Sequence, residues 1–326
     1  MKVCVFGVGA IGGHIAARLC AADVADVSVV ARGAQLDAIR AHGLLLKSGD
    51  HEIRGKPGVA TDDPGSLPKQ DVVIVTLKSH AVPAVAAAVD GLLKPDGVAV
   101  FPLNGLTWWW RHGRGTPQAP LPLLDPGAEL WNRLRERTLG CVIYSPNEVV
   151  SPGVILHIGG NRWVLGEPSD QKTPRVQAVV DLFTSSGLPA EVSPDIRAEI
   201  LRKLMSNAWS NPLGALTHLV QYGVVQDAEL KQIAVRLINE TLDVSKALGW
   251  DLRKEVDPEK QVSRVTPGPG SPPSMLQDVL LGRSLEVESH LGQTQAFARE
   301  YGVPVPTIDL VLPLLRGLDR SIRAAH

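Results

Sequence analysis

The sequence predicts two domains: an α/β domain built on a parallel sheet over residues 1–192, and an all-α domain over residues 193–326. Near-continuous Val/Ile runs recur in the first part of the chain, which is typical of parallel strands buried on both faces. From about residue 195 these runs disappear and long helical periodicities replace them. A length of 326 residues also exceeds what one hydrophobic core usually spans.

Four β-rich runs predict the strands of the sheet. They are KVCVF at 2–6, DVSVVAR at 26–32, DVVIVTLK at 71–78 and GVAVFPLN at 97–104. An alanine-rich stretch before the last run is predicted to be a crossover helix, as in a βαβ unit. The closely spaced β-rich segments at 138–160 and 162–167 predict an antiparallel extension of the sheet instead of another crossover.

The second domain is predicted to contain helices over 195–217, 226–249, 274–282 and 284–301. Pro189 and Pro194 flank the domain boundary. The stretch VTPGPGSPP at 265–273 is predicted to be a surface connection, because its prolines remove hydrogen-bond donors and fix φ.

Composition and charge exclude several classes of function. The 33 Lys and Arg residues balance 34 Asp and Glu residues without a long basic run, so we expect no nucleic acid partner. No apolar stretch reaches the roughly 18 residues of a membrane span. Cys4, Cys20 and Cys141 are scattered, and the nine histidines show no paired spacing, so we expect no metal site and a reducing, cytoplasmic location.

The motif GVGAIG at 7–12 predicts a dinucleotide-binding turn. Gly7 permits the sharp turn, Gly9 lets a pyrophosphate approach the backbone, and Gly12 brings helix and strand close together. The following helix directs unpaired N–H groups toward the phosphates. We therefore assign the cofactor site to this turn, including Ala10 and Ile11.

The end of the second strand indicates which nicotinamide cofactor is bound. The strand ends in Ala31-Arg32 and carries no carboxylate that would accept hydrogen bonds from the ribose hydroxyl groups of NADH. Arg32 can instead pair with the 2′-phosphate of NADPH, so NADPH/NADP+ is favoured over NADH. The alternative is a solvated arginine. Lys78 and Asn104 close two strands at the ligand-binding edge of the sheet, although Lys78 could cap a turn and Asn104 could be a left-handed turn residue before Gly105.

A polar stripe lies on the helix predicted over 195–217. Lys203, Asn207 and Asn211 are four residues apart and share one helical face. Facing an interdomain cleft, the lysine could protonate a carbonyl that receives hydride, and the two amides could hold substrate oxygens. The alternative is a solvated face. Because Asn211 precedes Pro212, we also expect the helix to kink or stop there.

Two further candidates follow the proline-rich connection. Ser274 stands three residues before Gln277, an arrangement that would make it the N-cap of a helix. Gly282 is predicted to end that helix and Ser284 to start the next, which places Glu286 in a first turn that favours a carboxylate. Both residues therefore have purely structural explanations.

Together these motifs resemble the 2-dehydropantoate 2-reductases, or ketopantoate reductases, across nearly the whole chain. The matching pieces are GVGAIG, VVAR, VTLKS, LNG, SPGVILHIGG with LGEP, IRAEILRKLMSNAWSNPLGALT, and SMLQD followed by a glutamate twelve residues after its serine. The glycine motif is shared by many families, whereas the RKL..N...NPL helix joined to SMLQD is highly specific.

The resemblance implies a Rossmann domain, a helical domain, and NADPH-dependent reduction of 2-dehydropantoate to pantoate in pantothenate and coenzyme A biosynthesis. It implies that Lys203 is the catalytic lysine and Glu286 its acidic partner. The implied substrate-binding residues are Asn207, Asn211, Ser274, which contacts the carboxylate, and Asn104; the implied cofactor contacts are Arg32, Lys78 and Asn104. Asp278 would support these residues without contacting the ligand itself.

The segment over 106–139 departs from the family pattern because it is longer and more aromatic. Trp108, Trp109 and Trp110 would form either a covered hydrophobic patch or part of the substrate pocket. In the second case the substrate is a bulkier or differently branched 2-oxo acid. A non-catalytic NADP(H)-binding sensor is a third hypothesis, and an exposed tryptophan cluster together with the long helices would suit a homodimer.

Overall fold

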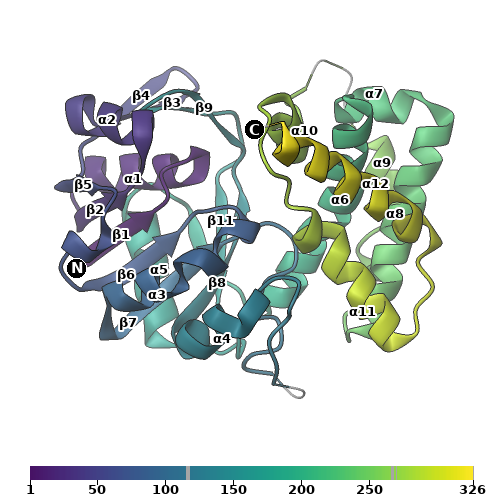
Figure 1. Cartoon of the computed structure of the whole chain (residues 1–326), viewed down its shortest axis with the longest axis horizontal. Helices are drawn as coiled ribbons and strands as arrows, with labels where there is room; N and C mark the ends of the chain where they lie inside the picture. The colour runs from purple at the N-terminus through teal and green to yellow at the C-terminus, as the bar shows by residue number, and fades with distance from the viewer. Residues whose placement is uncertain (115–117, 266–267, 269, 326) are drawn as a thin grey trace. The chain divides into compact units, whose positions relative to one another are not determined.

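The computed structural model describes residues 1–114, 118–265, 268 and 270–325. The chain forms two compact units, labelled by element in Figure 1. The first consists of Met1–Leu103 and Trp108–Glu199, and the second of Asn104–Thr107 and Ile200–His326. The first unit is α/β and the second is helical, which confirms the predicted fold class. A division into functional domains at 192/193 stays a prediction.

An eight-stranded sheet forms the centre of the first unit. Its order is β12-β11-β8-β7-β6-β1-β2-β5, and its neighbouring strands are parallel except for β8 and β11. The strands are β1 Lys2–Phe6, β2 Asp26–Val30, β5 Val59–Thr61, β6 Gln70–Val75, β7 Leu93–Pro102, β8 Thr138–Tyr144, β11 Arg162–Gly166 and β12 Ala190–Val192. The antiparallel β8–β11 pair confirms part of the predicted extension, but the strands at 147–151 and 154–157, predicted to belong to it, lie in a separate sheet.

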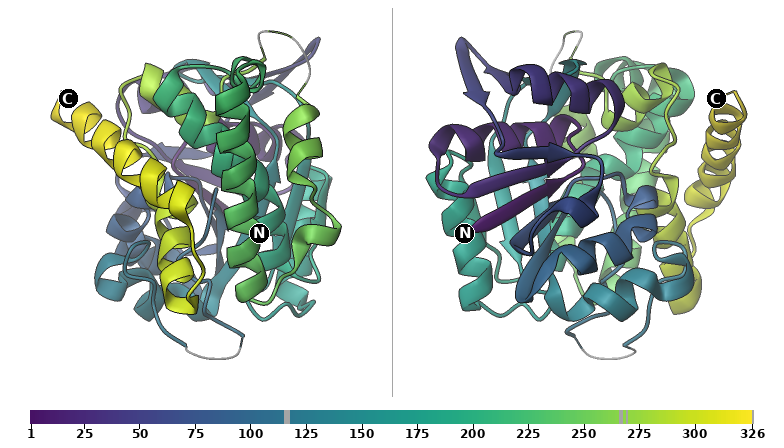
Figure 2. Two further views of the ribbon diagram at one scale, coloured as in Figure 1. Left: turned by 90° about the vertical axis from the view of Figure 1, so that its right-hand side faces the viewer. Right: turned by 60° about the vertical axis from the view of Figure 1, so that its left-hand side comes forward.

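Helices cover this sheet and connect its strands, as the two views of Figure 2 show. The helices are α1 Ala10–Ala22, α2 Gly33–His42, α3 Ala86–Leu92, α4 Glu129–Leu134 and α5 Pro174–Ser185. Short 3-10 turns lie at Pro64–Ser66, Ser79–Ala81, Pro83–Val85, Pro126–Ala128 and Arg135–Arg137. Ile15 of α1, Ile74 of β6 and Phe183 of α5 belong to one fully buried cluster, so the core lies between the sheet and its helices.

A second, four-stranded sheet packs on α1, and the sequence did not predict it. Its order is β4-β3-β10-β9, with β3 Leu44–Ser48, β4 His51–Gly55, β9 Asn147–Ser151 and β10 Val154–His157. A Cβ atom on Gly13 would lie 2.5 Å from Ile155, and one on Gly55 would lie 2.5 Å from the Ala17 carbonyl oxygen. The absence of side chains at these glycines therefore lets helix and sheet approach closely.

The second unit is built from helices, and a side chain caps the start of one of the longest of them. The elements are α6 Ile196–Thr217, which begins in the first unit, α7 Gln221–Gln226, α8 Ala228–Ala247, a 3-10 turn at Leu252–Lys254, α9 Pro258–Ser263, α10 Ser274–Leu280, a π-helical turn η7 at Glu288–Gly292, α11 Gln293–Tyr301 and α12 Pro306–Ala324. The Asp227 carboxylate accepts from the N–H groups of Glu229 and Leu230 at the start of α8. Residues 266, 267 and 269 of the predicted surface connection lie outside the described residues.

The helix α6 does not stop at Pro212, so the expected end of the helix was wrong. The helix continues to Thr217 with Pro212 inside it. Pro212 cannot donate to the carbonyl one turn earlier, but packing compensates, since Asn211 and Leu213 are both buried. Tertiary contacts of the flanking residues thus outweigh the local preference against helix before proline.

The helix predicted over 284–301 also begins later than predicted, whereas α10 begins at Ser274 as predicted. Helical geometry resumes at Val287, and Ser284 does not start a helix. Instead, the backbone N–H of Leu285 donates to Oδ1 of Asp319, on α12, over 2.8 Å. This tertiary hydrogen bond holds the chain in a non-helical form, and Glu286 therefore precedes the helix.

Candidate active site

The glycine turn after β1 has the geometry that a dinucleotide requires. Gly7 adopts φ +95, and a Cβ atom on Gly12 would lie 2.1 Å from the Gly7 carbonyl oxygen and 2.4 Å from Oγ1 of Thr76. At Gly9, by contrast, a Cβ atom would meet nothing within 4 Å. Steric crowding therefore explains Gly7 and Gly12, and Gly9 leaves open space at the start of α1.

The start of α1 suits an anion. Gly9 occupies its N-cap position, and among the described residues no side chain caps the helix and no acid lies in its first turn. Ala10 and Ile11, the first two helical residues, are half-buried beside this opening. The free N–H groups and the helix dipole favour a phosphate at this position.

Arg32 lies at the same edge of the sheet as the glycine turn. The N–H of Gly7 donates to the Val30 carbonyl over 2.9 Å, so the ends of β1 and β2 are adjacent. Arg32 follows two residues later, in extended conformation as the N-cap of α2, and its side chain is exposed. Both of its possible roles, phosphate contact and solvated arginine, fit this placement.

The two predicted strand-end residues lie beyond their strands. β6 ends at Val75, three residues before Lys78, which is half-buried and whose carbonyl accepts from Ala81 in a 3-10 turn. β7 ends at Pro102, and Asn104 belongs to the second unit. The positive φ of this loop is found at Gly105, at +74, and Asn104 is not a left-handed turn residue.

Lys203 and Asn104 are brought together within the second unit. Nζ of Lys203 donates to Oδ1 of Asn104 over 2.6 Å, and both side chains are half-buried. The loop that carries Asn104 is held by Ser289, whose carbonyl accepts from the N–H of Leu106 over 2.7 Å. A Cβ atom on Gly105 would lie 2.3 Å from that carbonyl oxygen, so only glycine allows this approach.

The polar stripe of α6 is not a solvated face. Asn211 is only 2% exposed, and Lys203 and Asn207 are half-buried. Among the described residues the Asn207 side chain has no hydrogen-bond partner, so its amide is available to a ligand. The Asn211 amide is engaged at both ends, with its oxygen toward Ser274 and Met275 and its nitrogen toward His290.

Ser274 does not cap its helix, which corrects the structural explanation predicted for it. Pro273 occupies the N-cap position of α10, and the Gln277 side chain donates to the Pro272 carbonyl over 2.9 Å. Ser274 Oγ donates instead to Oδ1 of Asn211 over 3.2 Å. The same Asn211 oxygen accepts from the N–H of Met275 over 3.1 Å, so a residue from another helix supplies the cap.

Glu286 and Asp278 are both buried, at 5% and 3% exposure. The Glu286 carbonyl accepts from Nδ1 of His290 over 2.9 Å and from Ser289 Oγ over 3.2 Å. The carbonyl of Asp278 accepts from the N–H of Arg283 over 2.8 Å. His290 was missed by the sequence analysis, because nothing in its local pattern distinguishes it from an ordinary core histidine.

The three tryptophans belong to the interior of the first unit, so they form neither an exposed cluster nor a surface patch. Trp109 is fully buried, and Trp108 and Trp110 are 2% and 5% exposed. The Arg197 guanidinium lies 5.4 Å from the Trp109 ring centre and 5.8 Å from that of Trp110. Trp108 meets Phe101 edge to face.

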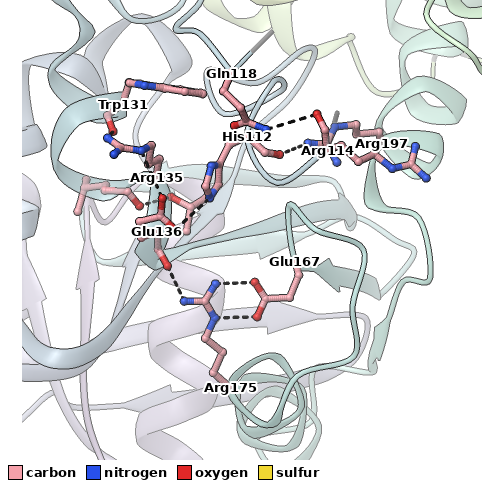
Figure 3. Close-up of polar contacts among 11 residues, drawn as sticks. His112, Arg114, Gln118, Trp131, Arg135, Glu136, Glu167, Arg175 and Arg197 are labelled. Atoms are coloured by element: carbon pink, nitrogen blue, oxygen red, sulfur yellow. Dashed lines mark hydrogen bonds and ion pairs between the residues drawn. The ribbon is translucent and has the colours of Figure 1, made fainter. Parts of the chain in front are cut away.

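Arg197, at the start of α6, holds this aromatic segment in place, and Figure 3 shows it beside His112 and Arg114. It donates to the carbonyl of Trp110 over 2.8 Å, to that of Pro168 over 2.7 Å, and to that of His112. Burial lowers the pKa of Arg197 to about 10, which still leaves it charged. Residues 115–117 of the segment lie outside the described residues.

A cavity of about 660 Å³ lies in the first unit and contains none of the predicted site residues. It is lined by His112, Gly113, Gln118, Trp131, Asn132, Arg135 and Glu136, several of which are drawn in Figure 3. Among the described residues, no cluster of His, Cys, Asp or Glu could hold a metal ion, and no helix is long and apolar enough to cross a membrane.

Comparison with known proteins assigns both parts of the chain to one family. The family model "Ketopantoate reductase PanE/ApbA" matches residues 3–170, and its C-terminal counterpart matches residues 195–319. A 2-dehydropantoate 2-reductase of Mesorhizobium japonicum is 36% identical over 322 residues, which cover 98% of each chain.

Solved structures share this fold. One of the ketopantoate reductase type from Ralstonia solanacearum has a TM-score of 0.90 and 31% identity, covering 98% of each chain. A D-mandelate dehydrogenase solved with NADH and anilino(oxo)acetate has a TM-score of 0.82 over 99% of this chain and all of its own. The two sequences are only 20% identical, so this similarity concerns the fold alone.

Proposed function

Because the chain belongs to the ketopantoate reductase PanE/ApbA family, we propose that it reduces 2-dehydropantoate to pantoate with NADPH. The reaction adds a hydride to the 2-keto carbon and a proton to the keto oxygen. Its product would feed pantothenate and coenzyme A biosynthesis. The pair formed by Lys203 and Asn104 is the observation that carries this proposal.

The residues of the first unit fit the nicotinamide cofactor. The open backbone at Gly9 and the uncapped start of α1 would take the pyrophosphate, with Ala10 and Ile11 beside it, and Gly7 and Gly12 shape the turn. The exposed Arg32, with no acid at that strand end, supports NADPH over NADH, and Lys78 and Asn104 would contact the nicotinamide side. When bound, the reduced cofactor supplies the hydride.

Lys203 supplies the proton. A half-buried ammonium held by an amide oxygen is well placed to donate to a keto oxygen, and it stabilises the alkoxide that develops there. Asn104 limits the rotamers of the lysine, which lowers the entropic cost of positioning it. Glu286, buried in the same unit, is proposed as the acidic partner.

The substrate would be held by Asn207, Asn211, Ser274 and Asn104. Asn207 has the most accessible amide of the α6 stripe and is the strongest candidate for a direct contact. Asn211 is buried and bonded to Ser274, so its contribution passes through the serine. The match to the family and to a 2-dehydropantoate 2-reductase over the whole chain supports 2-dehydropantoate over a bulkier 2-oxo acid.

The function is tested with purified protein, NADPH oxidation followed by absorbance, and a panel of 2-oxo acids. We expect 2-dehydropantoate to give the highest kcat/KM, and NADPH to exceed NADH. Another preferred keto acid would replace the substrate assignment. Tight NADPH binding without turnover of any keto acid would instead support a non-catalytic sensor.

Substitution of the lysine tests the mechanism directly. Lys203→Ala is expected to lower kcat by at least about 100-fold, while the affinity for NADPH stays within about twofold. Lys246→Ala on α8 is the matched control, because that lysine is exposed. Turnover retained in Lys203→Ala would refute the assignment of the proton donor.

The oligomeric state and the location are further parts of the proposal. Helix α12 exposes Leu310 and Leu314 at 67% and 56%, one turn apart, which supports pairing of two copies as a homodimer. Light scattering would measure the mass. The three cysteines Cys4, Cys20 and Cys141 are free, which fits the reducing cytoplasm that we propose as the location.

A further inference from the structure

A π-helical turn supports the loop that carries Asn104. In this turn, η7, the N–H of Gln293 donates to the carbonyl of Glu288, five residues earlier. In a regular α-helix Gln293 would donate to Ser289, four residues earlier. The Ser289 carbonyl accepts from the N–H of Leu106 over 2.7 Å. The wider turn therefore presents a backbone acceptor that holds the Asn104 loop.

An ion pair with helix α12 holds the first residue of this turn. Nε of Arg316 donates to Oε1 of Glu288 over 2.8 Å, and Nη2 donates to Oε2 over 2.7 Å. Two parallel hydrogen bonds between a guanidinium and a carboxylate determine the orientation of both groups as well as their distance. Arg316 therefore determines where the Glu288 side chain lies.

Gly292, at the end of the turn, makes room for this ion pair. A Cβ atom at position 292 would overlap Oε2 of Glu288 and would lie 3.3 Å from Nη2 of Arg316. Any larger residue at this position would displace the carboxylate from the guanidinium. The glycine, the π-helical turn and the ion pair thus belong to one arrangement.

Helix α12 also anchors the chain just before the turn. Oδ1 of Asp319 accepts from the N–H of Leu285 over 2.8 Å. Asp319 and Arg316 are three residues apart, so they lie on the same face of α12. Glu286, the proposed acidic partner of the lysine, lies between the two anchored residues, Leu285 and Glu288.

We propose that Arg316 is a positioning residue that acts through Glu288 on the π-helical turn. The turn keeps the Ser289 carbonyl in place for the loop, and the loop keeps Asn104 in contact with Lys203. This inference rests on the proposed function, since it makes the proposed proton donor depend on a residue of α12. The paired side chains are 36% and 35% exposed, so removal of the pair should alter the turn without unfolding the unit.

Loss of the guanidinium should slow catalysis. In Arg316→Leu we expect kcat to fall about 5- to 10-fold, less than in Asn104→Ala, because the amide is still present but is held less firmly. Arg320→Leu is the matched control, since Arg320 is exposed one turn further along α12, and it should keep the wild-type kcat. An unchanged kcat in Arg316→Leu would show that the ion pair does not position the lysine.

The partner carboxylate tests the same contact from the other side. Glu288→Gln keeps the shape of the side chain but removes its charge and one of its two acceptors, so kcat should fall to a similar extent as in Arg316→Leu. This variant also keeps the test decisive if Arg316→Leu folds poorly. A wild-type kcat in Glu288→Gln would contradict the proposal.

A double-mutant cycle distinguishes positioning from a general structural role. If Arg316 acts through Asn104, Arg316→Leu should cause no further loss of kcat once Asn104→Ala is present. If the two losses multiply instead, Arg316 affects the enzyme by another route, and the proposal is wrong.

Amide hydrogen exchange separates this inference from the proposed function. The N–H of Leu106 is bonded to Ser289, so NMR should find it protected in the wild type. In Arg316→Leu it should exchange at least about tenfold faster, while the N–H of Ile74, in the buried strand β6, keeps its rate. Unchanged exchange of Leu106 would overturn the proposal whatever the enzyme reduces. If the wild type reduces no keto acid, the proposed function fails, and this exchange rate still tests whether Arg316 holds the loop.

Discussion

Nζ of Lys203 lies 2.6 Å from Oδ1 of Asn104, although 99 residues separate them in the sequence. The contact joins a long helix to a four-residue loop that the chain contributes to the second unit before returning to the first. The proposed proton donor is thus positioned by a residue that precedes it by a third of the chain.

Removal of the Asn104 amide should impair catalysis. In Asn104→Ala the ammonium loses its acceptor and samples more rotamers, so we expect kcat to fall about 10- to 100-fold. Steady-state kinetics measure the effect, and Asn132→Ala, on the exposed side of α4, is the matched control. An unchanged kcat in Asn104→Ala would show that the contact does not position the lysine.

The loop that carries Asn104 should depend on Gly105. Alanine at this position would combine a φ of +74 with a Cβ atom 2.3 Å from the Ser289 carbonyl oxygen. We expect Gly105→Ala to lower the free energy of unfolding by about 2–4 kcal/mol, measured by urea denaturation. Gly49→Ala is the control, because φ is +57 there but a Cβ atom meets nothing within 4 Å, and its cost should be about 1 kcal/mol. Equal costs would mean that the contact with Ser289 is unimportant.

Two glycines of the nucleotide turn should respond differently to alanine. Gly12→Ala places a Cβ atom against the Gly7 carbonyl and should destabilise the fold, which thermal unfolding would detect. Gly9→Ala has open space, so the melting temperature should hardly change while NADPH binding weakens by about tenfold or more, measured by fluorescence titration. Unaltered NADPH affinity in Gly9→Ala would contradict the assignment of the phosphate site.

His14 should make the first unit sensitive to acid. Burial lowers its pKa to about 3, although the contact with Asn147 opposes this shift. Nε2 accepts from Nε of Arg18 over 2.9 Å, and Nδ1 lies 2.7 Å from the Asn147 oxygen, an arrangement that suits the neutral ring. Between its ordinary pKa of about 6.5 and pH 3 the unfolded chain binds a proton that the folded chain does not.

Stability is therefore expected to be lost as pH falls through this window, by at most about 1.4 kcal/mol per pH unit from this one group. Urea denaturation between pH 7 and pH 4 measures the slope. In His14→Leu the slope should be shallower by up to that amount, and in His80→Ala, where the histidine is exposed, it should match the wild type. A steep slope retained in His14→Leu would assign the acid sensitivity to other groups.

Much of the fold follows from local pattern. The Val/Ile runs predicted the strands at 2–6, 26–32, 71–78 and 97–104 within a few residues, because a strand buried on both faces must be apolar throughout. The four-stranded sheet escaped prediction because it pairs β3 with β10, about 109 residues apart, and neither strand is long or uniformly buried. Pairing between distant short strands leaves no local signal.

The candidate site divides in the same way. The spacing of Lys203, Asn207 and Asn211 on one helical face was determined by the sequence alone, since helical geometry repeats every 3.6 residues. The N-cap predicted at Ser274 failed because the Asn211 oxygen, 64 residues from Met275, took over that role. A capping pattern in the sequence considers only donors and acceptors a few residues apart, so it cannot predict a cap supplied by a distant residue.

By itself, the sequence determined the class of fold, the glycine turn and the helical face that carries the lysine, because each depends on residues only a few positions apart. Only the tertiary structure decided that the tryptophans are interior, that Lys203 donates to Asn104, and that His290 contacts Asn211. The physical reason is that burial and hydrogen bonding depend on which groups meet in space. Lys203 and Asn104 are 99 positions apart in the sequence, and Asn211 and His290 are 79 positions apart.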